Sequence, residues 1–312
     1  MNLDRRVSSP TAPMPADAGF DLDAWVAQRL HQVEQALSLW VASEAPAGLG
    51  EAMRYAVLDG GKRLRPLLVL AASEAVSGQH HAALRAACAT ELIHAYSLVH
   101  DDMPCMDNDV LRRGKPTVHV RFGEAGALLA GDALQALAFE LLTPADDSVP
   151  EHMQAQLCRL LALAAGSAGM AGGQAIDLAS VGRTLDEAQL REMHRLKTGA
   201  LLQASVLMGA ACGNAAAYTQ AALAQYGAAI GLAFQVVDDI LDVTADSATL
   251  GKTAGKDAQN DKPTYVSILG LARSKAYADE LLAQALKALQ DSGLADTRAL
   301  TALAHLVVTR IR

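Results

Sequence analysis

Residues 81–102 read HAALRAACATELIHAYSLVHDD, an apolar stretch rich in Ala and Leu that closes on two adjacent aspartates. Ala and Leu are among the strongest helix formers, so this stretch predicts one long helix. The helix should end near Asp102, because Pro104 lacks an N–H donor and clashes with a preceding helical turn. Pro104 and Gly114 then bracket a loop. We expect this loop to bend and to bring Asp107 back towards Asp101.

The same helical composition continues along the chain. Apolar spacing and helix stop signals predict further helices at about 21–43, 52–61, 62–76, 124–142, 148–170, 186–213, 215–243 and 272–290, and from about 295 to the C-terminus. The sequence shows no strong β alternation and no Pro/Gly/Ser-rich linker in its middle. We therefore predict an all-α protein with a single large multi-helix bundle around a central cleft. This domain covers residues 21–312 and follows a flexible N-terminal tail of residues 1–20.

Composition excludes several classes of protein. Hydrophobic residues make up 51% of the 312 residues, so a disordered chain is excluded, and aromatics at 4% argue against an all-β fold. The net charge of 26 − 34 = −8 argues against nucleic-acid binding. We expect no membrane-spanning run and no signal peptide. The four cysteines are scattered without zinc spacing, which is typical of reduced thiols and a cytoplasmic location.

A second acidic cluster, Asp238-Asp239-Ile-Leu-Asp242, follows the apolar run GLAFQVV. Residues i and i+4 share a helix face, so Asp238 and Asp242 point the same way, with Gln235 on the same side. One such cluster would more often be a solvated helix end. Two clusters that each end an apolar helix predict two walls of one cleft. Packing several carboxylates together is unfavourable unless a cation offsets the charge, and oxygen ligands beside phosphate favour Mg²⁺.

A magnesium site that also binds phosphates requires basic residues nearby. Four segments supply them: Gly61-Lys62-Arg63-Leu64-Arg65, Arg112-Arg113-Gly114-Lys115, Lys197-Thr198-Gly199, and Lys252 to Lys262. Arg offers paired contacts to phosphate oxygens, and Lys acts as a point charge. Each alone would be read as a solvated surface charge, but two of the segments directly follow an acidic cluster. His94 lies seven residues before Asp101, on the same helical face, and is a further candidate phosphate contact.

These segments together resemble the polyprenyl synthetase family, the trans-prenyltransferases of isoprenoid synthesis. The resemblance covers the chain after its N-terminal tail and is carried by an ordered set of motifs: GGKRLRP, the region from HAYSLVHDDMPCMDNDVLRRGK onwards, GGQAIDL, HRLKTGAL, GLAFQVVDDILDV and GKTAGKD. It is closest to bacterial members that make farnesyl diphosphate, including the two-residue insertion that gives DDxxxxD. Asn108 departs from many relatives, which carry Asp there.

The resemblance implies an isoprenoid synthase fold, a homodimer and a condensation of dimethylallyl or geranyl diphosphate with isopentenyl diphosphate to (2E,6E)-farnesyl diphosphate. It also implies roles for residues at matching motif positions. Three Mg²⁺ ions would be held by Asp101, Asp102, Asp107, Asp238 and Asp242. The allylic substrate and its cation would be contacted by Arg112, Lys197, Thr198, Gln235, Lys252 and Lys262. Isopentenyl diphosphate would be bound by Gly61, Lys62, Arg65, His94 and Arg113. Support for the site would come from Gln174 and Asp177.

Product length is predicted from the residues below the first acidic cluster. Tyr96 lies five residues before Asp101, about 7.5 Å down a helix axis that rises about 1.5 Å per residue. A ring there can form the floor of the apolar pocket, whereas the neighbouring Ser97 is small. By resemblance, an aromatic at this position together with the insertion is typical of enzymes that stop at fifteen carbons. The alternative interpretation is that Tyr96 only packs in the core.

Other functions remain open at the level of sequence. Geranyl or geranylgeranyl diphosphate synthases share the motifs. A terpene cyclase would need no second diphosphate site, and GGKRLRP, His94 and Arg113 argue for one. A non-catalytic prenyltransferase subunit would typically lose an acidic cluster, and here both are intact. A helical Mg²⁺-dependent phosphohydrolase would not explain an apolar wall at Tyr96.

Overall fold

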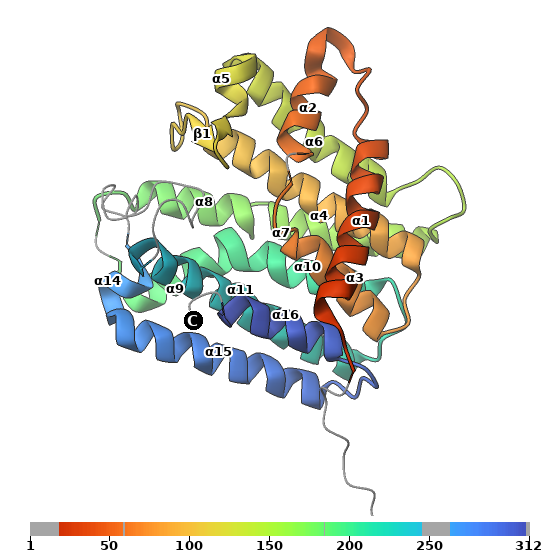
Figure 1. Ribbon diagram of the computed structural model, residues 1–312, viewed down its shortest axis with the longest axis vertical. Coiled ribbons are helices and arrows are strands. Elements are labelled where there is room, and N and C mark those ends of the chain that lie inside the picture. Colours follow the sequence, from red (N-terminus) through yellow and green to blue (C-terminus); the bar gives the residue numbers. More distant parts are fainter. Residues whose placement is uncertain (1–18, 59, 184, 245–262, 310–312) are drawn as a thin grey trace, which may run out of the picture.

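The computed structural model describes residues 19–58, 60–183, 185–244 and 263–309, and it is almost wholly helical (Figure 1). The first half contains α1 (Leu22–Trp40), η1 (Pro46–Gly48), α2 (Leu49–Val57), α3 (Leu64–Ala75), α4 (His80–Asp101), α5 (Val118–Phe122), α6 (Glu124–Leu142) and α7 (Glu151–Ala165). The second half contains α8 (Met170–Ala179), α9 (Glu187–His194), the π-helical turn η2 (Arg195–Gly199), α10 (Ala200–Ala211), α11 (Ala217–Thr244), α14 (Tyr265–Leu269), α15 (Leu271–Asp291) and α16 (Arg298–Thr309). The prediction of an all-α fold is confirmed.

The loop after α4 contains a small antiparallel hairpin that the sequence did not indicate. Its strands are β1 (Leu111–Arg112) and β2 (Lys115–Pro116), with Arg112 opposite Lys115. Arg113 and Gly114 form the turn with φ of 53° and 77°, and glycine adopts such a positive φ without strain. The hairpin places Arg112 within hydrogen-bond distance of Asp102, the residue that follows α4.

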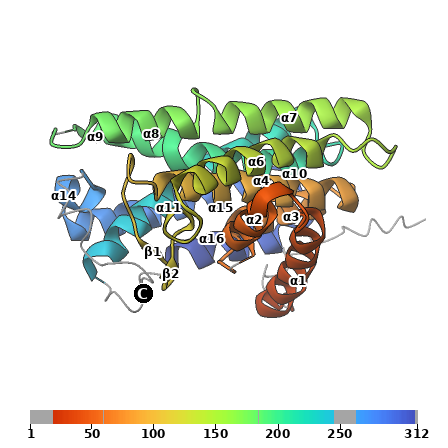
Figure 2. The same ribbon diagram turned by 90° about the horizontal axis from the view of Figure 1, so that it is seen from above.

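Two hydrophobic clusters make up the core. The first lies among α1, α2, α4, α6 and α7, and the second among α11, α15 and α16. Helices α3 and α10 contribute to both, because Val69 and Leu201 face the first cluster while Leu68 and Leu202 face the second. These shared helices favour one continuous domain, although the boundary at residue 20 stays a prediction. Figure 2 shows α7, α8 and α9 following one another along one outer edge of the bundle.

Two expectations about the helices were wrong in detail. The sequence placed no helix between 170 and 186, yet α8 forms there despite Gly172 and Gly173, which have low helix propensity. A Cβ on Gly173 would lie 2.1 Å from the backbone N of Lys197, so tertiary packing selects glycine there. The predicted helix at 186–213 is divided into α9, η2 and α10. The interruption falls at Lys197-Thr198-Gly199, as the sequence indicated.

Candidate active site

The loop after α4 folds back on the end of that helix, as predicted. The backbone N–H of Asp107 donates to the carbonyl of Asp101 at 2.8 Å, and that of Asp109 donates to the carbonyl of Asp102 at 3.1 Å. Asn108 has a φ of 51°, a left-handed conformation that asparagine tolerates better than most residues. Its departure from the usual Asp is therefore compatible with the turn. The bend brings the predicted ligands Asp101 and Asp107 together.

Asp102 and Arg112 are joined to each other. The Arg112 guanidinium donates from Nε to Oδ2 of Asp102 at 2.8 Å and from Nη2 to Oδ1 at 2.5 Å. Asp102 is 3% exposed, and its carboxylate is engaged on both oxygens. The sequence predicted the two residues separately, as metal ligand and diphosphate contact. In the structure each already has a partner of opposite charge, so direct ligation through Asp102 would have to be shared with Arg112.

Asp101 lies in an electrostatically unfavourable place for a carboxylate. Burial raises its pKa to about 6, and the negative charge of Asp107 adds to this rise, whereas Lys197 opposes it. Lys197 is the strongest of the charges that act on this pKa, so burial rather than the neighbouring carboxylates is the main cause of the rise. The attraction between Asp101 and Lys197 also shows that the end of α4 faces the π-helical turn.

The π-helical turn η2 is held between two glycines of neighbouring helices. A Cβ on Gly173 of α8 would collide with the backbone of Lys197, and one on Gly231 of α11 would lie 2.8 Å from the Cα of Gly199. Single π-helical turns are frequent at functional sites. From this turn, Lys197 Nζ donates to Oδ2 of the buried Asp177 at 2.6 Å, and the supporting role of Asp177 stays a prediction.

The next residue of the turn, Thr198, contacts Gln235 on α11. The Thr198 hydroxyl donates to Oε1 of Gln235 at 3.1 Å, while Nε2 of Gln235 donates to Oδ1 of Asp239 at 2.9 Å. An ionised carboxylate only accepts hydrogen bonds, so Asp239 fixes which end of the Gln235 amide faces Thr198. Asp239 also accepts the backbone N–H of Tyr265 at 2.8 Å. Asp239 therefore orients the predicted site residue Gln235, although the motif analysis named Asp239 without giving it a role.

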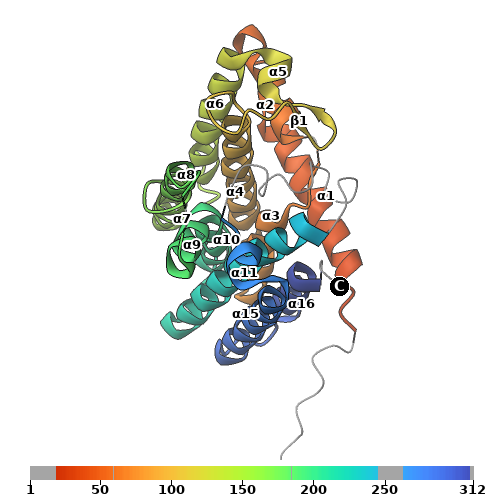
Figure 3. The same cartoon turned by 90° about the vertical axis from the view of Figure 1, so that its left-hand side faces the viewer.

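The second acidic cluster lies at the C-terminal end of α11. Asp238 and Asp242 are one turn apart on this helix, and Asp238 attracts Arg65, which opposes the effect of burial on the pKa of Arg65. Helices α4 and α11 both end on the side of the molecule that carries β1 and α14, the side facing the viewer in Figure 3. Within the described residues, no group of three or more His, Cys, Asp or Glu side chains forms a metal cage by itself.

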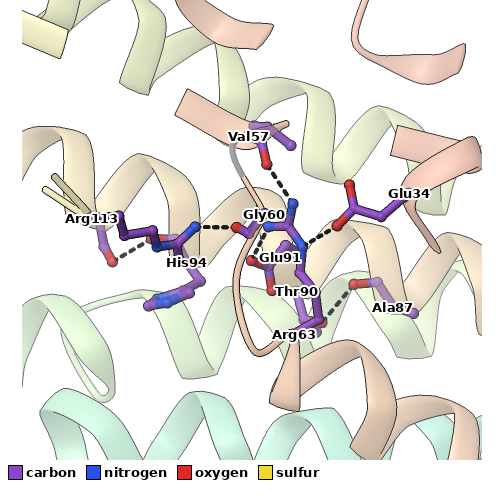
Figure 4. Close-up of polar contacts among 10 residues, drawn as sticks. Glu34, Val57, Gly60, Arg63, Ala87, Thr90, Glu91, His94 and Arg113 are labelled. Atoms are coloured by element: carbon purple, nitrogen blue, oxygen red, sulfur yellow. Dashed lines mark hydrogen bonds and ion pairs between the residues drawn. The ribbon is translucent and has the colours of Figure 1, made fainter. Parts of the chain in front are cut away.

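A cluster of basic residues lies beside α4. Burial lowers the pKa of Arg65, and its Nε has no hydrogen-bond partner within the described part of the chain. Burial, followed by the positive charges of Arg65 and Arg113, lowers the pKa of His94 well below its usual value, so its imidazole is neutral. Arg113 donates to the carbonyl of Gly60, and His94 lies close by on α4 (Figure 4). The predicted phosphate contacts Arg65, His94 and Arg113 are therefore neighbours.

The remaining predicted contacts differ in their surroundings. Gly61 and Lys62 lie exposed in the loop between α2 and α3, and a Cβ on Gly61 would be 2.8 Å from the Arg113 guanidinium. Both amide atoms of Gln174 on α8 are buried without a hydrogen-bond partner among the described residues. Such buried polar atoms are uncommon unless a ligand or water meets them. Lys252 and Lys262 fall outside the described residues.

Tyr96 lies partly buried one turn and a half before the end of α4, and its role as a pocket floor stays a prediction. Burial raises the pKa of its phenol, and the charge of Asp101 adds to the rise, so the ring lies below the first acidic cluster. The ring packs edge-on against His100 at a centroid distance of 5.7 Å. Gly131 of α6 allows His100 to sit there, since a Cβ on Gly131 would be 2.1 Å from its Nε2. Ser97 donates its hydroxyl to the carbonyl of His94 at 2.9 Å.

Helix α6 is an exception to the expectation that no segment could span a membrane. By length and composition its 19 residues suffice, with a mean hydropathy of 1.4 in the most apolar window. One face is buried against α4, which is typical of a core helix in a soluble bundle. The opposite face exposes Leu128 and Leu129, the latter by 57%.

Comparisons with known proteins find related sequences over most of the chain. A family model described as polyprenyl synthetase matches residues 46–303. The chain is 50% identical over 277 residues to the probable farnesyl diphosphate synthase of Bradyrhizobium diazoefficiens, covering 87% of this chain and 83% of the relative. It is 43% identical over 316 residues to geranylgeranyl pyrophosphate synthase 7, chloroplastic, of Arabidopsis thaliana, covering 99% and 91%.

Solved structures share the fold over the same extent. An FPP/GFPP synthase from Zymomonas mobilis superimposes with a TM-score of 0.82 and 41% identity, covering 92% of this chain and 98% of that one. A geranyltransferase from Helicobacter pylori, complexed with magnesium and isoprenyl diphosphate, gives a TM-score of 0.80 and 35% identity, with coverages of 97% and 99%. The fold and the paired acidic helix ends define an isoprenyl diphosphate synthase. The chain belongs to the polyprenyl synthetase family. The predictions of family, fold class and prenyltransferase activity are confirmed.

Proposed function

We propose that this chain condenses dimethylallyl and then geranyl diphosphate with isopentenyl diphosphate to give (2E,6E)-farnesyl diphosphate. The observation that carries the proposal is that an acidic group and a basic group of side chains lie next to each other. Two acidic helix ends lie on one side of the bundle, and beside α4 lies the cluster of Arg65 from α3, His94 from α4 and Arg113 from the hairpin turn. A condensation needs two diphosphate sites, whereas ionisation of a single substrate needs one. The name of the Bradyrhizobium relative supports the fifteen-carbon product.

Asp101, Asp107, Asp238 and Asp242 would hold Mg²⁺, which fits the residues present. Their donors are all carboxylate oxygens, the ligands that hard cations prefer, and Asp101 is strained by burial and by its neighbour Asp107. Mg²⁺ is usually bound by one or two carboxylates with substrate phosphates as the other ligands, so an open protein site is expected. When bound, Mg²⁺ would neutralise charge on the departing diphosphate. The number of ions, predicted as three, stays a prediction, as does the ligand role of Asp102.

The allylic diphosphate would be bound by Lys197, Arg112, Lys252 and Lys262. Breaking the allylic C–O bond leaves an allyl cation, which is stabilised by negative ends of fixed dipoles. Oε1 of Gln235 and the oxygen of Thr198 are two such groups, and Asp239 holds the Gln235 amide in the orientation that presents its oxygen. The backbone carbonyl of Lys197 on the same π-helical turn is a third. Surrounding apolar helices keep water away from the cation.

Isopentenyl diphosphate would be bound by Arg65, His94 and Arg113, with Gly61 and Lys62 in the adjacent loop. Arg65 has a buried donor without a protein partner among the described residues, and neutral His94 can donate one N–H to a phosphate oxygen. The double bond of isopentenyl diphosphate then attacks the cation, forming the new C–C bond, and one proton leaves. The released diphosphate is the suspected acceptor of that proton, so no side chain is assigned as the base.

Tyr96 would stop growth at fifteen carbons, with Ser97 beside it in the pocket wall. Its ring packs edge-on against His100, and the charge of Asp101 adds to the effect of burial that raises the pKa of its phenol. The names of relatives extend to geranylgeranyl products, so product length is the feature of the proposal that needs direct measurement.

A homodimer through the exposed face of α6 is part of the proposal. Leu128 and Leu129 form an apolar strip on α6, and Leu163 of α7 is also exposed. Exposed apolar patches often mark protein interfaces. The proposed location is the cytoplasm, where the cysteines stay reduced and water-soluble diphosphate substrates are made.

The test is an assay of purified protein with Mg²⁺, isopentenyl diphosphate and either dimethylallyl or geranyl diphosphate, with products identified by mass spectrometry. Farnesyl diphosphate supports the proposal. A geranyl or geranylgeranyl product would keep the reaction and overturn the chain length. Cyclic hydrocarbon, free phosphate or no product would instead indicate a cyclase, a phosphohydrolase or a non-catalytic subunit.

A further inference from the structure

Arg63 lies at the base of the loop that joins α2 to α3, and its side chain links three elements (Figure 4). Its Nε donates to Glu34 of α1 at 2.7 Å, its Nη1 donates to Glu91 of α4 at 2.6 Å, and its Nη2 donates to the carbonyl of Val57 at 2.6 Å. Arg63 is only 4% exposed. Because all three nitrogens are used and the group is buried, Arg63 is not available to bind a diphosphate itself.

The backbone of Arg63 is also unusual. Its φ is 46°, in the left-handed region that is sterically unfavourable for a residue with a Cβ. Such backbone conformations persist where surrounding contacts over-determine them, and they are concentrated at functional sites. The three hydrogen bonds to the side chain supply those contacts.

Glu91 links Arg63 to the proposed isopentenyl site. The charge of Glu91 is the first attraction that opposes the effect of burial on the pKa of Arg65, two residues after Arg63. On the other side of Arg63, Lys62 and Gly61 are its immediate neighbours in the loop, and Gly60 accepts a hydrogen bond from Arg113. Gly61, Lys62 and Arg65 are therefore linked to Arg63 along the chain, and Arg65 also through Glu91. Arg113 is linked to the same loop by its hydrogen bond to Gly60, and His94 lies one turn from Glu91 on α4.

We propose that Arg63, through Glu34 and Glu91, is a positioning residue that sets the loop and Arg65 in the geometry required to bind isopentenyl diphosphate. This inference rests on the proposed function. It assigns no substrate contact to Arg63, and it predicts a selective effect on one of the two substrates. A residue that only holds α1 to α4 would instead change the stability of the fold without favouring either substrate.

The test compares Arg63→Lys with Arg54→Lys. Lysine has one nitrogen and cannot reach the three acceptors of the arginine fork. Arg54 is the matched control, because its side chain also joins α2 to α1, through the carbonyls of Ser38 and Val41 at 2.8 and 2.6 Å. Its guanidinium hydrogen bonds all go to Ser38 and Val41 and none to the loop between α2 and α3 among the described residues. For Arg63→Lys we expect the KM for isopentenyl diphosphate to rise at least tenfold, with the KM for geranyl diphosphate and kcat within twofold. For Arg54→Lys we expect both KM values within twofold of the wild type.

Each outcome has a distinct meaning. Unchanged KM values in Arg63→Lys, or an equal rise in both, would overturn the inference while leaving the proposed function intact. A wild-type protein that makes no condensed product would overturn the proposed function instead. If Arg63→Lys does not fold, Glu34→Ala is the alternative test of the positioning role. Glu34 is partly exposed, so removing its carboxylate should destabilise the fold less than changing the buried Arg63. That variant should raise the KM for isopentenyl diphosphate at least threefold, and no change would refute the positioning role.

Discussion

Replacing Asp101 by Asn should stabilise the metal-free protein while abolishing its activity. The pKa of Asp101 rises from 3.8 to about 6 on folding, chiefly because of burial. At about 1.36 kcal/mol per pKa unit, ionised Asp101 destabilises the fold by at most about 3 kcal/mol. Asparagine has nearly the same shape and carries no charge, so the substitution removes this penalty. It also removes a proposed Mg²⁺ ligand, and turnover should fall by at least a hundredfold.

The stabilisation should depend on pH with a definite sign. Well below pH 3.8 the Asp101 carboxyl is protonated in both the folded and unfolded states, and well above pH 6 it is ionised in both. The penalty therefore appears as pH rises between these values and is retained above them. From linkage we expect Asp101→Asn to gain about 1 kcal/mol at pH 4.5 and about 3 kcal/mol at pH 7.5.

The assay is thermal unfolding of wild type and variant in EDTA at both pH values. With an unfolding entropy of about 2.1 cal/mol/K per residue, a gain of about 3 kcal/mol raises Tm by about 5 °C. Added Mg²⁺ with an inert diphosphate should then stabilise the wild type more than the variant. A lower Tm for Asp101→Asn at pH 7.5, or a difference that does not grow with pH, would refute the electrostatic reasoning. Undiminished turnover would refute the ligand assignment.

Three further substitutions test other parts of the site. Tyr96→Ala should lengthen the product beyond fifteen carbons, and a mutant that still makes only farnesyl diphosphate on chromatography would remove the floor role. Asp239→Asn should lower kcat at least tenfold with both KM values within threefold, since an amide no longer dictates the orientation of Gln235; steady-state kinetics that show a KM effect alone would contradict this. Leu129→Glu should convert a dimer into a monomer of 32.6 kDa in light scattering, and an unchanged mass would exclude this face of α6 as the interface.

The fold could be predicted from sequence because its signals are local. An apolar run that closes on an acidic pair, followed by Pro104, predicted both the end of α4 and the bend after it. The helix α8 could not be predicted, because Gly172 and Gly173 lower the local helix propensity. Their close contacts explain them: a Cβ on Gly173 would meet the π-helical turn, and one on Gly172 would meet the carbonyl of Ser167. Local propensity gives no information about that contact between segments far apart in sequence.

The individual site residues were predicted by motif, but their pairings were not. Arg63 contacts Glu34 and Glu91, which lie 29 and 28 residues away, and no periodicity connects such positions. Glu91 did carry a signal, since it is the one Asp, Glu, Lys or Arg between Arg85 and Asp101 in an apolar helix. A carboxylate in such a place requires a buried partner. Asp239 carried a weaker one, four residues after Gln235 on the same helix.

The unbroken course of α4 has a consequence for the proposed control of product length. His94, Tyr96 and Asp101 all lie on this single helix, which spans His80–Asp101. At about 1.5 Å per residue, the separation from Tyr96 to Asp101 along the axis is fixed near 7.5 Å. Because α4 is one continuous helix, these side chains are held at fixed distances from one another along its axis. Under the proposed floor role of Tyr96, we expect product size to change with the volume of the side chain at position 96, because deleting one residue between Tyr96 and Asp101 would rotate them by about 100° relative to each other.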